Sequence, residues 1–147
     1  MNTPPDHAGK LHRTATLLFS PRMCAWSAAL LYTAMLVIGS IPGKAEAASA
    51  AVPDKLLHLV AYSLLSALVY GAMAGKPLLR ALRTLVIVAV LGALDEGLQS
   101  LLPYRNAGWD DWRVDVIAAL LITSTFSLMQ AMRPALTTNR KAKEKNR

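Results

Sequence analysis

Four long apolar segments, separated by short polar stretches, dominate the pattern along the chain. No charged residue occurs between Arg22 and Lys44, and that stretch is long enough to cross a hydrocarbon core of about 30 Å at about 1.5 Å per residue. Charged or proline-containing stretches bound or interrupt the other three segments. We therefore predict an all-α fold, an antiparallel bundle of four transmembrane helices at about 24–42, 55–75, 82–102 and 112–132.

A soluble helical bundle is the alternative interpretation of these segments. Soluble helices need a polar outer stripe, whereas residues 62–75 (YSLLSALVYGAMAG) and 116–129 (VIAALLITSTFSLM) contain no charged residue. Hydrophobic residues make up 54% of the chain, above the roughly 45–50% of ordinary soluble domains. The sequence therefore favours a membrane protein.

The first apolar segment has a rival interpretation as a cleaved signal peptide. Basic residues precede it, and the small residues AEA or ASA after Lys44 resemble a cleavage site. Against this, the apolar stretch exceeds the usual signal-peptide core of about 7–15 residues. We favour a retained helix.

The net charge of +7 comes from basic residues gathered in three segments. These are an N-terminal arm at 1–22, the connection after the second helix, and a tail at 134–147, so that 23–133 forms the membrane domain. The positive-inside rule places basic segments in the cytoplasm, so we expect both termini there. We expect no nucleic-acid partner, and we predict that the tail from Thr137 is a disordered extension that touches anionic lipid.

Polar side chains gather where three of the predicted helices reach the opposite membrane face. Residues three or four apart share one face of a helix. The resulting pairs are Asp54 with His58, Glu96 with Gln99, and Asp111 with Asp115, and Arg105 lies in the connection between the last two. Because ionisable groups in membrane helices generally face a bundle interior or a wet cavity, we predict one cluster at this end.

Several neighbouring residues carry structural predictions. Asp54 is predicted to be the N-cap of the second helix, with its side-chain oxygen accepting from the first turn. Gly92 and Gly97 are predicted to let another helix approach the third helix closely. Asp95, beside Glu96, is expected to face water.

An ordered set of short motifs resembles the VanZ-like family of small bacterial membrane proteins. The motifs are Ser-Ile-Pro, Asp-Lys-x-x-His-x-x-x-Tyr, Glu-x-x-Gln, Arg and Asp-x-x-x-Asp, and the resemblance spans roughly residues 26–121. Their positions are Ser40-Ile41-Pro42, Asp54, Lys55, His58, Tyr62, Glu96, Gln99, Arg105, Asp111 and Asp115. Asp115 stands where the family often has Asn, and alanines replace the glycines of its last helix, which leaves close packing of that helix in doubt.

The resemblance implies a multi-pass protein of the bacterial inner (cytoplasmic) membrane with a role in the cell envelope. The family takes its name from a member associated with resistance to the glycopeptide teicoplanin, and a relation to antibiotic resistance follows from that name alone. The resemblance does not identify a cofactor, which stays unknown.

The first hypothesis is a site that binds or modifies a lipid-linked cell-wall precursor, such as one carried on a polyprenyl phosphate. Here His58, Glu96 and Asp111 are the candidate catalytic residues, with His58 and Glu96 as base and acid. Arg105 and Lys55 would hold a phosphate or carboxylate. The remaining candidate ligand-binding residues are Asp54, Gln99 and Asp115.

Two alternatives use the same residues differently. In one, the cluster is a structural ion-pair network in a non-enzymatic membrane module. In the other, Asp54, His58, Glu96 and Asp111 form a divalent-metal site, since histidine with carboxylates suits zinc or manganese, although no HExxH motif is present.

Overall fold

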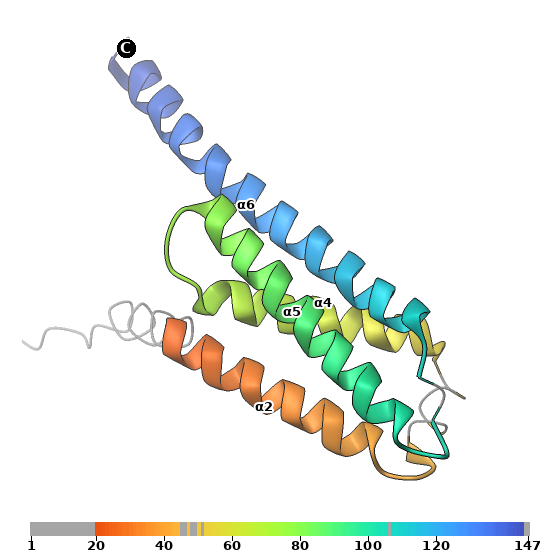
Figure 1. Ribbon diagram of the computed structural model, residues 1–147. Coiled ribbons are helices and arrows are strands. Elements are labelled where there is room, and N and C mark those ends of the chain that lie inside the picture. The colour runs from red at the N-terminus through yellow and green to blue at the C-terminus, as the bar shows by residue number, and fades with distance from the viewer. Residues whose placement is uncertain (1–19, 45–46, 48–49, 51, 106, 146–147) are drawn as a thin grey trace, which may run out of the picture.

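A computed structural model gives an all-helical fold of four helices along the described chain. It describes residues 20–44, 47, 50, 52–105 and 107–145, and side chains as far as residue 132. The helices are α2 (Pro21–Gly39), α4 (Asp54–Ala72), α5 (Pro77–Ser100) and α6 (Trp109–Lys145). They run alternately up and down, so the α2–α4 and α5–α6 connections share one end of the bundle and the α4–α5 connection lies at the other (Figure 1).

All four helices are long and apolar enough to cross a membrane, over Pro21–Gly39, Asp54–Ala72, Pro77–Ser100 and Trp109–Met132. Large apolar side chains cover the outside of the bundle, for example Leu30, Val60, Val86 and Leu121. Exposure of this much apolar surface is unfavourable in water and favourable against lipid. The predicted antiparallel bundle of a membrane protein is confirmed.

The first helix begins and ends one turn earlier than the sequence predicted. The Ser20 hydroxyl caps α2 by accepting from the Met23 amide at 3.2 Å, and Pro21 occupies the first turn, where its missing N–H costs nothing. Within the bundle α2 packs against α4, and its Tyr32 donates a hydrogen bond to the Leu91 carbonyl of α5 at 2.9 Å. These contacts make α2 part of the helical bundle. Of the predicted arm at 1–22, residues 21 and 22 belong to α2, and residues 1–19 lie outside the described residues, as does most of the candidate cleavage sequence.

The third helix begins at Pro77, five residues before the predicted start at residue 82. The second helix was predicted to run to residue 75, but α4 already ends at Ala72, and Pro77 opens α5. Proline suits the first helical turn, and the Leu, Arg and Ala residues after it are strong helix formers. Arg80 and Arg83 therefore belong to a helix and not to a connection.

Two further boundaries differ from the prediction. Asp54 is the first residue of α4, whose N-cap is Pro53, so Asp54 is not the N-cap; its negative charge still lies at the favourable end of the helix dipole. The last helix does not stop at Arg133-Pro134 but continues to Lys145, so the tail from Thr137 is not a disordered extension up to that residue. The Lys, Arg, Ala and Glu residues of this stretch all have high helix propensity.

α6 packs along both α5 and α4. Ala118 and Ala119 are fully buried there, so alanine permits the close packing that the missing glycines had left in doubt. On α5, a Cβ added at Gly92 would lie 2.9 Å from Asp115 Oδ2, whereas one at Gly97 would meet nothing within 4 Å. The predicted close approach is therefore confirmed at Gly92 and wrong at Gly97.

Candidate functional site

A buried histidine–aspartate pair joins α4 to α6 near the end where the α5–α6 connection lies. His58 Nδ1 lies 3.0 Å from Asp115 Oδ1, and the Asp115 side chain is fully buried. Tyr62, one turn along α4, stacks on the imidazole with 5.9 Å between ring centroids and 2° between ring planes. Packing on both sides therefore fixes the orientation of the histidine ring.

A second chain of hydrogen bonds runs from the bundle interior to the α5–α6 connection. The Tyr62 hydroxyl donates to Asp95 Oδ2 at 3.0 Å, and the Gln99 amide donates to Asp95 Oδ1 at 3.1 Å. Arg105 in turn donates to Gln99 Oε1 at 2.7 Å through Nη2, while its buried Nε has no partner among the described residues. The guanidinium is thus held at the edge of the site with a donor still available.

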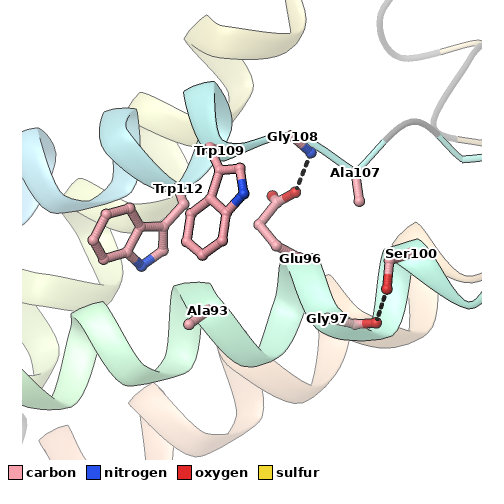
Figure 2. A pocket seen from close by; sticks show the side chains of 8 residues that line it. All are labelled: Ala93, Glu96, Gly97, Ser100, Ala107, Gly108, Trp109 and Trp112. Carbon is pink, nitrogen blue, oxygen red and sulfur yellow. Dashed lines mark hydrogen bonds between the residues drawn. The ribbon is translucent and has the colours of Figure 1, made fainter.

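Glu96 lies on a different side of α5, where it faces the start of α6 (Figure 2). Its Oε2 accepts a hydrogen bond from the Gly108 amide at 2.8 Å, and its Oε1 is buried without a partner among the described residues. Trp109 and Trp112 wall the same pocket of about 300 Å³ with their rings edge to face, 5.8 Å apart. Trp112 also donates to the Ala89 carbonyl at 2.9 Å, which ties α6 to α5.

A cavity of about 310 Å³ lies between α2, α4 and α5 and has two unlike parts. Its apolar wall comes largely from α2 and includes Leu31, Ala34, Met35 and Ile38. Its polar part consists of Lys44, Asp54, His58, Asp95, Gln99 and Arg105. The cavity therefore offers an apolar groove that ends beside two cations and several hydrogen-bonding groups.

Most of the site residues predicted from sequence come together at this end of the bundle. His58, Glu96 and Asp115 each offer a potential ligand atom, and these atoms lie within 4.8 Å of one another. Asp54, His58 and Asp111 form a second such group, which shares the histidine. Lys55 is the exception, because its side chain is exposed and it does not line the cavity, which Lys44 lines instead.

Asp95 is the site residue that sequence reasoning missed. It was expected to face water, but it is only 7% exposed and is bonded to Tyr62 and Gln99. In the structure, buried residues on α5 recur at positions 84, 88, 92, 95 and 99, so Asp95 lies on the stripe of the helix that faces its neighbours. Gln99 therefore pairs with Asp95, four residues away, and not with Glu96.

The chain matches no protein-family model, no curated protein and no solved structure. The resemblance to the VanZ-like family therefore depends on the motif residues alone. In chemical terms, the site combines two cations, a cavity with apolar and polar walls, and a histidine close to several carboxylates.

Proposed function

We propose that this protein is a VanZ-like membrane protein of the bacterial envelope, and that its two-part cavity binds a lipid-linked cell-wall precursor. The observation that carries the proposal is the cavity between α2, α4 and α5, with an apolar wall at one part and, at the other, Lys44 and Arg105 together with Asp54 and Asp95. A prenyl or acyl chain fits the apolar wall, and a phosphate fits the two cations. The relation to teicoplanin resistance rests on the family resemblance alone.

Arg105 is the residue on which phosphate binding depends most in this proposal. Its planar guanidinium suits phosphate geometry, and the hydrogen bond to Gln99 orients it before a ligand arrives. A pre-oriented side chain loses less conformational entropy on binding. Lys44 supplies a second positive charge at the same part of the cavity.

The positive-inside rule supports an orientation in which both termini are cytoplasmic and the cavity opens at the outer face of the inner membrane. Lipid-linked wall precursors act at that face. In intact cells, a membrane-impermeant thiol reagent should label Lys55→Cys and spare Lys76→Cys, which lies in the α4–α5 connection. The reverse labelling pattern would contradict this orientation.

The binding test uses purified protein in nanodiscs and a polyprenyl phosphate as the probe. Wild-type protein should bind, and Arg105→Ala should weaken binding by about tenfold or more, because it removes a charge-assisted contact worth about 1.5–3 kcal/mol. Arg113→Ala is the matched control, since Arg113 lies near the same end of the bundle but is exposed and paired with Asp110 at 2.9 Å. Absence of wild-type binding, or equal loss in both variants, would contradict the proposal.

A structural role for the same cluster is the second candidate function. The observation in its favour is that the bonds His58–Asp115 and Tyr62–Asp95 link α4 to α6 and to α5. In this case Arg105→Ala and Tyr62→Phe should lower the thermal stability in detergent without any ligand-dependent effect. Normal stability of Arg105→Ala together with lost lipid binding would count against it.

A further inference from the structure

Two carboxylates of the cluster each bury an oxygen that lacks a hydrogen-bond partner among the described residues. Asp115 is fully buried, and its Oδ1 faces His58 while its Oδ2 has no partner. Glu96 uses Oε2 on the Gly108 amide, and its Oε1 is buried without a partner. A buried carboxylate oxygen without a partner is strongly unfavourable, more so inside a membrane protein.

The two carboxylates converge on the same histidine. One atom from each of His58, Glu96 and Asp115 lies within 4.8 Å of the others. Asp115 Oδ2 points toward α5 at Gly92, one turn before Glu96 on that helix. Two negative charges this close in a low-dielectric interior repel each other strongly unless a positive charge lies between them.

We propose that His58, Glu96 and Asp115 bind a divalent transition-metal ion, Zn²⁺ or Mn²⁺. One neutral imidazole and two carboxylates carry a charge of −2, which a divalent cation neutralises. The 3.0 Å between His58 Nδ1 and Asp115 Oδ1 is close to the about 3.3 Å that separates two ligands of a tetrahedral zinc ion with bonds of about 2.0 Å. Nitrogen with carboxylate oxygen is a ligand set that both metals accept.

The second group, Asp54, His58 and Asp111, is the competing assignment. All three of its members also lie within 4.8 Å of one another, but both aspartates are partly exposed, so water can solvate them. The first group contains a fully buried carboxylate with an unpartnered oxygen, which a bound cation would stabilise. Three protein ligands also leave a fourth position open for a water or an anionic ligand.

Metal binding is measured on purified protein in detergent without added lipid, so its result is separate from that of the lipid-binding test. Purified protein is stripped with a chelator, incubated with ZnCl₂ or MnCl₂ and desalted, and its metal content and calorimetric affinity are measured. We expect one metal ion per chain and a higher thermal unfolding temperature with metal than with chelator. Failure of the wild-type protein to retain stoichiometric metal and to show that shift would overturn the proposal.

Matched variants then identify the ligands. Glu96→Gln is nearly isosteric and should weaken metal affinity by about tenfold or more, since losing even an outer-shell partner typically costs 10–100-fold. Asp110→Asn, an exposed neighbour paired with Arg113, should leave the affinity within about twofold. If Asp111→Asn abolishes binding while Glu96→Gln retains it, the second group holds the metal and the proposal is wrong.

Discussion

Charged side chains lie between α4, α5 and α6 at both ends of the bundle, but the groups that surround them differ. At the end near the α4–α5 connection, Arg80 lies 4.3 Å from the centroid of the Tyr70 ring and donates to the Tyr70 carbonyl at 2.7 Å. It also donates to Gln130 Oε1 at 3.2 Å, which leaves only Nε without a partner among the described residues. One cation here meets neutral acceptors and an aromatic face.

At the other end, three carboxylates lie close together, and each accepts at least one hydrogen bond. Asp95, Glu96 and Asp115 come from two helices, and buried oxygens of Glu96 and Asp115 have no partner in the described structure. Arg80 also has one nitrogen without a partner in the described structure, and it lines a cavity of about 650 Å³. The two ends therefore differ in the sign and type of their buried groups, and among the described residues only the second end offers the carboxylate and imidazole ligands that a metal ion requires.

The largest expected loss of stability is at His58, in the carboxylate cluster. His58→Leu removes the partner of Asp115 Oδ1, so a buried carboxylate remains with neither oxygen paired, and we expect a loss of about 3–5 kcal/mol. The double variant His58→Leu/Asp115→Leu should lose less than the sum of the two single variants, because the uncompensated charge is gone. Thermal or denaturant unfolding in detergent with chelator measures both. A single-variant loss below about 1 kcal/mol would show that the pair is not a buried charge pair.

The next effect concerns the close contact between α5 and α6. Gly92→Ala places a Cβ 2.9 Å from Asp115 Oδ2 and 3.3 Å from Trp112 Cδ1, so we expect a loss of about 1–3 kcal/mol in unfolding free energy. Gly97→Ala is the matched control on the same helix, where the added methyl meets nothing within 4 Å. It should stabilise the protein by about 0.5–1 kcal/mol, since alanine loses less backbone entropy in a helix. Equal effects of the two substitutions would contradict the packing at Gly92.

The smallest effect belongs to the Arg80 end. Arg80→Met keeps an apolar stem but removes the contacts with Tyr70 and Gln130, and we expect a loss of about 1–2 kcal/mol, since hydrogen bonds between membrane helices average about 0.6 kcal/mol and a cation–π contact adds about 0.5–1 kcal/mol. Unfolding measures the loss, and calorimetry should give an unchanged metal affinity. A large change in metal affinity would contradict the separation of the two ends, because it would show that the contacts of Arg80 affect the metal site.

Helical periodicity predicted part of the site directly. The spacing of Asp54 with His58, and of Asp111 with Asp115, places each pair on one helix face, and alternating helix directions bring those faces to one end of the bundle. Helical periodicity could not determine whether Asp95 or Glu96 faces Tyr62 and Gln99. In a soluble protein the apolar stripe identifies the buried face, but a membrane helix is apolar on its lipid-facing side as well.

The sequence by itself determined the all-helical membrane fold, the number of helices and the clustering of polar residues at one end. These follow from segment length, hydropathy and helical period, which are local properties of the chain. Only the tertiary structure decided that Asp95 pairs with Tyr62, that Lys44 replaces Lys55 beside Arg105, and that α2 walls the cavity. Those outcomes depend on how each helix is rotated against its neighbours, and that rotation is set by packing between helices distant in sequence.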